Sequence, residues 1–168
     1  MVSGVYGVGK SIVTAQMADL LEERGVRYAA LDLDWLSWAW SDPDDDDEAL
    51  DRLMLEHLEL LVGNLRRRGN DRYLLAGAVM TRAEWHAIET TMGMPVRLVR
   101  LTAEPTVIRQ RLTNEPTTGR LHDARQTEAW LSEPGADEPT ADLVIANDGP
   151  ILDTAEAILA WSGWLEGG

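Results

Sequence analysis

The fold of this chain is decided by the stretch Gly4-Val5-Tyr6-Gly7-Val8-Gly9-Lys10-Ser11, which fits the phosphate-binding pattern G-x-x-x-x-G-K-S/T without a mismatch. Its glycines let backbone N–H groups turn inward around phosphate oxygens, where a Cβ atom would obstruct them. The lysine supplies charge for the β- and γ-phosphates, and the serine hydroxyl is a ligand for Mg²⁺. A helix that begins near Gly9 adds the positive end of its dipole. The stretch therefore predicts a nucleotide-phosphate site with contacts from Gly4, Tyr6, Gly7, Val8, Gly9, Lys10, Ser11 and Ile12.

Lysine occurs nowhere else in the chain. The other 14 of its 15 basic residues are arginine. A compact ammonium fits a phosphate pocket in a way that a planar guanidinium does not, so a lysine kept at this one position indicates phosphate binding. The alternative, a glycine-rich turn between strand and helix that binds no ligand, gives no reason for it.

Composition limits the remaining classes of function. A length of 168 residues predicts a single domain over 1–168, and the absence of cysteine excludes disulfides and thiolate chemistry and fits the cytoplasm. The sequence shows neither a signal peptide nor a run of apolar residues long enough to cross a membrane. A net charge of −14 predicts no nucleic-acid or membrane partner, since both are anionic. The oligomeric state is not predicted.

Apolar patterning alternates between strands and helices along the whole chain. Helices are expected from the glycine-rich stretch to 24 and over 49–68, 81–92, 104–112, 123–131 and 151–165, and strands over 27–33, 73–80, 96–101 and 143–146. Such alternation predicts an α/β fold with a parallel sheet covered by helices on both faces. Only residues 1–3 precede the glycine-rich stretch, so the first strand is short or the chain begins further upstream.

Two carboxylates and a group of tryptophans stand at the end of the second expected strand. Ligands of open α/β sheets bind beyond the carboxyl ends of strands, which makes Asp32 and Asp34 candidate site residues. Trp35, Trp38 and Trp40 follow them, three of the seven tryptophans in the chain. Two interpretations stay open: an aromatic face packed in the core, or an apolar wall for a substrate.

The end of the third expected strand offers two more candidates. Gly77 lies within the run 73–80, where a glycine indicates close approach by another backbone or by a ligand. Arg82 follows, as a binding group for an anion or as an ordinary residue at the start of a surface helix. Further on, the polar loop at about 113–126 carries Arg120 and Arg125. It predicts a lid that closes over a phosphoryl group, or else a plain surface loop.

Over its whole length the chain resembles the P-loop kinases of small molecules and nucleoside monophosphates, such as shikimate kinase, gluconate kinase, chloramphenicol phosphotransferase and adenylylsulfate kinase. The resemblance rests on the stretch 4–11, on the Asp-x-Asp at 32–34, and on the segments 107–112 and 141–149 with the lid between them. It implies a three-layer fold with five parallel strands in the order 2-3-1-4-5. The sequence departs from shikimate kinases at the third strand, where only Gly77 replaces a glycine-rich segment, and the tryptophans suit a less polar acceptor.

The resemblance also implies roles for individual residues. Asp32 would hold Mg²⁺ through water together with Ser11, and Asp34 would orient the acceptor hydroxyl or take its proton. Arg111 would lie by the adenine or the phosphates, and Arg120 would reach over the γ-phosphate. The base would be bordered by the turn that contains Asn147, Gly149 and Pro150, and the acceptor by Asp34, Trp35, Trp38, Gly77 and Arg82.

The predicted function is an ATP-dependent phosphotransferase that moves the γ-phosphate of MgATP to a hydroxyl of a small molecule. Catalysis would depend on Lys10, Mg²⁺, Asp34 and lid arginines such as Arg120. Two alternatives remain open. One is a nucleotide kinase, which needs arginines near the acceptor, where only Arg52 and Arg82 are close in sequence. The other is an accessory protein that binds ATP without transferring phosphate. A GTPase is disfavoured because the turn at 147–148 lacks the Asn-Lys-x-Asp guanine signature.

Overall fold

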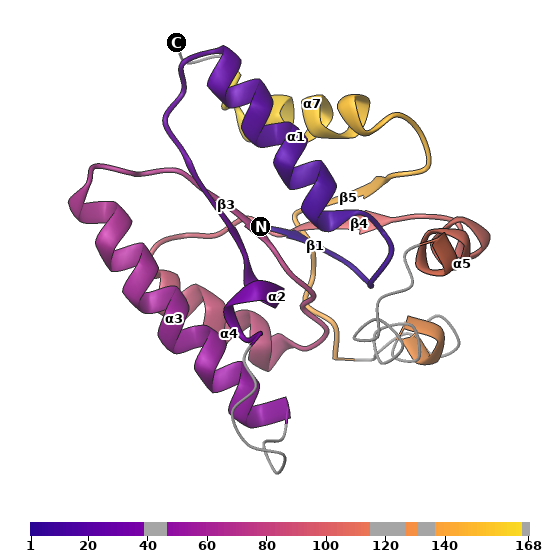
Figure 1. Cartoon of the computed structure of the whole chain (residues 1–168), viewed down its shortest axis with the longest axis horizontal. Helices are drawn as coiled ribbons and strands as arrows, with labels where there is room; N and C mark the ends of the chain where they lie inside the picture. The colour runs from indigo at the N-terminus through magenta and orange to yellow at the C-terminus, as the bar shows by residue number, and fades with distance from the viewer. Residues whose placement is uncertain (39–46, 115–126, 131–136, 166–168) are drawn as a thin grey trace.

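A computed structural model describes residues 1–38, 47–114, 127–130 and 137–165. Five strands form one parallel sheet: β1 (Val2–Ser3), β2 (Ala29–Asp32), β3 (Tyr73–Ala76), β4 (Val99–Thr102) and β5 (Leu143–Ala146). Their order across the sheet is β2-β3-β1-β4-β5 (Figure 1). The predicted fold class and strand order are confirmed.

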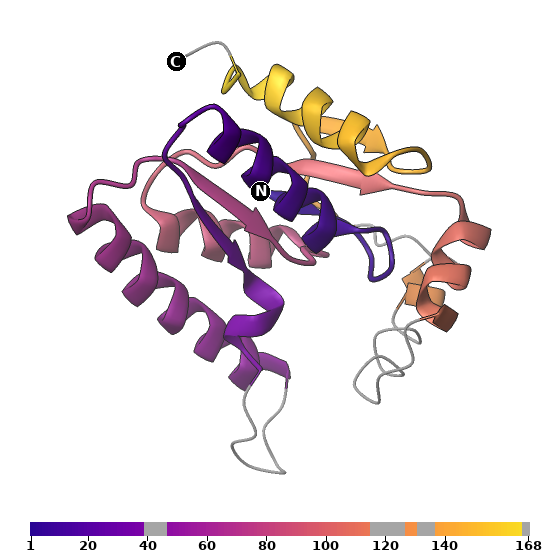
Figure 2. The same cartoon turned by 45° about the horizontal axis from the view of Figure 1, so that its top comes forward.

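Helices cover both faces of this sheet. The described helices are α1 (Lys10–Glu23), α2 (Leu33–Leu36), α3 (Asp47–Arg67), α4 (Arg82–Met92), α5 (Pro105–Asn114) and α7 (Ile151–Ser162), with one further helical turn at 127–130. Helices α1 and α7 lie on one face, and α3 and α4 lie on the other (Figure 2). The arrangement is the predicted three-layer sandwich.

The interior strand β3 contributes side chains to the core on both faces of the sheet. Side chains alternate along a strand, so Leu74 packs with the α1 and α7 side of the molecule while Leu75 packs with the α3 and α4 side. All four residues of β3 are buried, which explains why its sequence is a continuous apolar run with no alternation.

Several element boundaries differ from those predicted. Strand β2 ends at Asp32, because this residue is the N-cap of α2 and its side chain accepts a hydrogen bond from Asp34 N. Strand β3 ends at Ala76, although the apolar run continues to 80. Beyond it, Val79 N donates to Ser3 Oγ, so the polypeptide leaves the sheet there. Continuous apolar runs carry no signal that marks where a buried strand stops.

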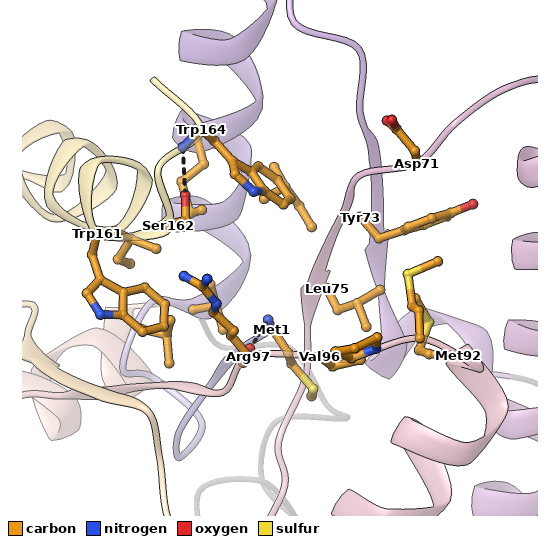
Figure 3. Close-up of a pocket in the computed structure, with 17 residues that line it drawn as sticks. Met1, Asp71, Tyr73, Leu75, Met92, Val96, Arg97, Trp161, Ser162 and Trp164 are labelled. Atoms are coloured by element: carbon orange, nitrogen blue, oxygen red, sulfur yellow. Dashed lines mark hydrogen bonds between the residues drawn. The ribbon is translucent and has the colours of Figure 1, made fainter. Parts of the chain in front are cut away.

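A cavity of about 210 Å³ lies at the amino-terminal ends of the strands. Figure 3 shows Met1, Tyr73, Trp161 and Trp164 around it, with Arg97 facing the Trp161 ring at 5.2 Å. Its lining contains none of the residues predicted to bind nucleotide or acceptor. Among the helices that the structure describes, none is long and apolar enough to span a bilayer.

Candidate active site

The glycine-rich stretch forms a loop between β1 and α1 whose backbone only glycine can adopt. Gly9 has a φ of 101°, and a Cβ atom there would lie 2.6 Å from Asn147 Nδ2. At Gly4, with a φ of 145°, a Cβ would lie 2.7 Å from the carbonyl oxygen of Leu101. Both positions would be strained and crowded with any other residue. The sequence pattern thus corresponds to a required backbone shape.

Two side chains hold this loop from behind. Asn147 Nδ2 and Arg111 Nη1 both donate to the carbonyl oxygen of Val8, at 2.8 and 3.1 Å. Arg111 Nη2 also donates to the Asn147 carbonyl at 2.8 Å, and Asn147 Oδ1 accepts from Thr154 Oγ1 at 3.1 Å. These bonds fix a loop carbonyl toward the protein, which favours the inward-turned N–H groups that bind anions.

This bracing gives Asn147 and Arg111 a role that the sequence did not reveal. Asn147 is only 1% exposed, and its polar atoms bond to protein. The turn that follows it leaves Gly149 and Pro150 exposed at the start of α7. Contact of these four residues with a nucleotide stays a prediction.

Lys10 begins α1 and is buried against the loop. Its side chain is 5% exposed, and Nζ lies 4.4 Å from the centroid of the Tyr6 ring, a cation–π distance. The N-cap of α1 is Gly9, which has no side chain to bond the N–H groups of the first turn. Charge and helix N-terminus therefore meet at the mouth of the loop, as a phosphate site requires.

Ser11 links the loop to the second strand. Its hydroxyl donates to Asp32 Oδ2 at 2.6 Å, and Asp32 Oδ1 accepts from Asp34 N at 3.1 Å. Hydroxyl and carboxylate oxygens are the ligands that Mg²⁺ prefers, together with phosphate oxygens and water. Among the described residues, no three acidic or histidine side chains form a separate metal cluster. Ser11 and Asp32 therefore fit a Mg²⁺ that arrives with a nucleotide.

Two tryptophans stand beside these carboxylates, exposed to solvent. Trp35 is 64% and Trp38 72% exposed, and their rings pack together with centroids 4.6 Å apart and planes tilted by 42°. Core packing is therefore wrong for this pair. Trp40, the third of the group, lies outside the described residues.

Gly77 acts through the neighbouring helix α2. A Cβ atom at Gly77 would lie 3.0 Å from the Cβ of Leu33, the buried first residue of α2. The close approach at this glycine is thus made by the side chain of Leu33, and contact of Gly77 with an acceptor stays a prediction. Gly77 lets α2 settle against the end of β3 and so positions Asp34 and Trp35.

Arg82 is the first residue of helix α4. It follows Thr81, the N-cap of α4, which forms a capping box with Glu84. Its Nε lies 3.6 Å from Asp137 Oδ1, and its backbone N–H donates to the Asp137 carbonyl at 3.0 Å. These contacts give Arg82 a structural role, and its contact with an acceptor stays a prediction.

Most of the expected lid lies outside the described residues, including Arg120 and Arg125. The helical turn that follows it, at 127–130, is tied to the rest of the molecule. Thr127 Oγ1 donates to the Tyr6 carbonyl at 3.4 Å, and Arg109 makes two hydrogen bonds with Glu128, at 2.6 and 3.0 Å. The hydrogen bonds from Arg109 hold the pKa of Glu128 below its ordinary value. The segment after the lid is therefore anchored next to the phosphate loop.

No protein-family model matches the chain, and no curated protein matches it by sequence. Solved structures do. A shikimate kinase from Bacteroides thetaiotaomicron is 13% identical with a TM-score of 0.67, covering 96% of both chains. A sugar kinase from Janibacter sp. is 20% identical with a TM-score of 0.65, covering 96% of this chain and 92% of its own.

An adenylylsulfate (APS) kinase from Mycobacterium tuberculosis, solved in complex with AMPPNP and APS, is 17% identical with a TM-score of 0.62. The match covers 96% of this chain and 95% of the kinase. At such identities the likeness concerns the fold. The sheet order, the loop at 4–11 and these likenesses agree with one another, and the chain has the fold of the P-loop kinases of small molecules.

Proposed function

We propose that this protein is an ATP-dependent phosphotransferase that moves the γ-phosphate of MgATP to a hydroxyl of a small molecule. One observation carries the proposal: the hydrogen bond from Ser11 to Asp32 joins the phosphate loop to the strand end that bears Asp34. Phosphate, metal and acceptor groups thus belong to one continuous site. The printed names of the structural neighbours, which include shikimate, sugar and adenylylsulfate kinases, support the same class of reaction.

The chemistry assigned to these residues is positioning and charge stabilisation. Lys10 and the N–H groups of the loop stabilise the β- and γ-phosphates. Ser11, and Asp32 through water, would hold a Mg²⁺ ion, which would supply neutralisation of charge on the phosphates. Asp34 orients the acceptor hydroxyl and takes its proton. A bond forms between the acceptor oxygen and the γ-phosphorus, the bond from the γ-phosphorus to the bridging oxygen breaks, and ADP leaves.

The described basic residues near the acceptor side do not favour a nucleotide kinase. Such an enzyme needs arginines that bind an acceptor phosphate. Arg52 is paired with Glu48 at 2.8 Å within α3, and Arg82 is placed against Asp137. The proposal therefore specifies a hydroxyl acceptor.

The test is incubation of the protein with MgATP and a broad mixture of metabolites and antibiotics, followed by mass spectrometry for species that gain a phosphoryl group. The wild type is expected to yield such a species, and Lys10→Ala none. Asp34→Asn is expected to bind ATP as the wild type does but to lose the product. The matched control is Asp19→Asn, on the exposed side of α1, which keeps full activity.

Two results would contradict the proposal. ATP binding with no phosphorylated product from any fraction of the mixture would favour the accessory-protein alternative. Full turnover by Asp34→Asn would remove this carboxylate from the mechanism.

A further inference from the structure

Among the described residues, Trp35 and Trp38 form a pair of large exposed apolar side chains beside the candidate site. Large aromatic side chains are normally buried, and two adjacent exposed indoles mark a surface that binds something. Trp35 lies in the same short helix as Asp34, and Trp38 follows the C-cap of that helix, with its N–H donating to the Trp35 carbonyl at 3.3 Å. A molecule stacked on these rings is therefore next to the group proposed to activate its hydroxyl.

The exposed pair Trp35 and Trp38, called the platform below, is connected to a short helix that the rest of the molecule holds in place. Leu33, the first residue of α2, packs against Gly77, where a Cβ atom would leave it no room. At the other end of the helix, Nδ1 of His57 on α3 donates to the Leu36 carbonyl at 2.6 Å. Rigid aromatic rings bind with little loss of conformational entropy, which is why tryptophan is common at binding sites. The contacts of Leu33 and Leu36 thus hold the short helix that carries Trp35.

The described charges next to this platform do not favour an anionic ligand. Residues 32–38, which include both tryptophans, contain two aspartates and no lysine, arginine or histidine. Asp34, which would face the acceptor, would repel a carboxylate or sulfate on it. Indole faces, by contrast, attract cations.

We infer that the acceptor is a neutral or positively charged hydroxyl compound with an aromatic or otherwise apolar face that stacks on Trp35 and Trp38. This inference rests on the proposed function for its choice of a hydroxyl compound. It separates the protein from its structural neighbours that are named for acidic acceptors, such as shikimate and adenylylsulfate. Specificity would follow from aromatic stacking on one side and carboxylates on the other.

A series of three probes that share one phenyl ring and one primary hydroxyl tests the inference: phenylalaninol, which is cationic, N-acetylphenylalaninol, which is neutral, and N-succinylphenylalaninol, which is anionic. Each is titrated calorimetrically into the protein, with and without AMPPNP and Mg²⁺. The cationic and neutral probes are expected to bind, and the anionic probe at least about tenfold more weakly.

Single substitutions of the two tryptophans test whether the probes bind to their rings. Trp35→Ala and Trp38→Ala are each expected to weaken binding of the neutral probe by about tenfold, the upper range for an aromatic contact. The matched control is Leu60→Ala on α3, which truncates another exposed apolar side chain, 70% exposed, and should bind the probe as the wild type does. AMPPNP affinity, measured in the same proteins, is expected to stay unchanged.

The results separate this inference from the proposed function. Equal or tighter binding of the anionic probe, unchanged binding in both tryptophan variants, or no binding of any probe would each overturn the inference. Failure of AMPPNP to bind, with the charge preference and the tryptophan effects intact, would instead overturn the proposed function and leave the inference about ligand charge standing.

Discussion

Asp32 is the residue whose single carboxylate serves three purposes. One oxygen accepts the Ser11 hydroxyl, the other caps α2 through Asp34 N, and its negative charge is available to a metal ion. An asparagine would keep one oxygen to accept from Asp34 N, and its amide NH2 could donate to the Ser11 hydroxyl oxygen, so the main loss would be the negative charge. Substitution at this position therefore separates metal binding from folding.

Asp32→Asn is expected to fold and to bind ATP without Mg²⁺ nearly as the wild type does. The increase in affinity on adding Mg²⁺ should fall by about tenfold or more, the usual effect of removing a group that holds a metal through water. Calorimetric titration of ATP with and without Mg²⁺ measures this, with Asp19→Asn as control. An unchanged Mg²⁺ dependence would exclude Asp32 from the metal site.

For individual residues, the sequence predicted the local arrangement of neighbours in the chain and missed the contacts between residues that are far apart in sequence. The loop at 4–11 is one local pattern, so its conformation followed from the spacing of glycines. Asn147 bonds to Val8 across 139 positions, and no local pattern records such a pair. The only available signal was an asparagine in a turn between a strand and a helix.

At the scale of elements, helix α2 connects fold and function, and its position depends on Gly77. The sequence identified this glycine as a point of close approach, because glycine inside a strand has that meaning. What approaches was not predictable, since Leu33 comes from the end of another strand. The short helix itself was missed, because four residues are too few to show a helical period.

Gly77→Ala is expected to displace Leu33 and with it α2. Overpacking of this kind costs about 1–3 kcal/mol of unfolding free energy. Binding of N-acetylphenylalaninol should weaken while ATP affinity changes little, because the loop at 4–11 is not displaced. Denaturant unfolding and the two titrations measure these effects, with Gly63→Ala in α3 as control, where an added Cβ has room. Equal losses of ATP and probe binding would contradict this role.

At the scale of the whole molecule, the alternation of strands and helices predicted the parallel sheet and the family resemblance implied its strand order, and the structure confirms both. The buried ion pair between Arg100 of β4 and Glu138 was not foreseen. In the sequence, Arg100 is simply one position of the strand expected over 96–101. Its partner, Glu138, lies 38 positions later in an acidic segment, where the sequence pattern does not predict burial.

Removing one partner of this ion pair should lower the free energy of unfolding more than replacing both partners by apolar residues. Arg100 is only 7% exposed, and this burial lowers the pKa of its guanidinium. Glu138→Ala is expected to cost about 3–5 kcal/mol by leaving that charge uncompensated, and Arg100→Met with Glu138→Leu distinctly less. Denaturant unfolding of the two variants decides, and a double variant less stable than the single one would contradict this account.

The central claim, one continuous site from the phosphate loop to α2, is tested most directly by a crystal structure with AMPPNP and Mg²⁺. The triphosphate is expected in the loop at 4–11, with Lys10 moved from the Tyr6 ring to the β- and γ-phosphates. The ion should lie by Ser11 and Asp32, and the γ-phosphate should face Asp34. A nucleotide bound elsewhere, for example in the cavity beside Trp161, or a γ-phosphate turned away from α2, would contradict it.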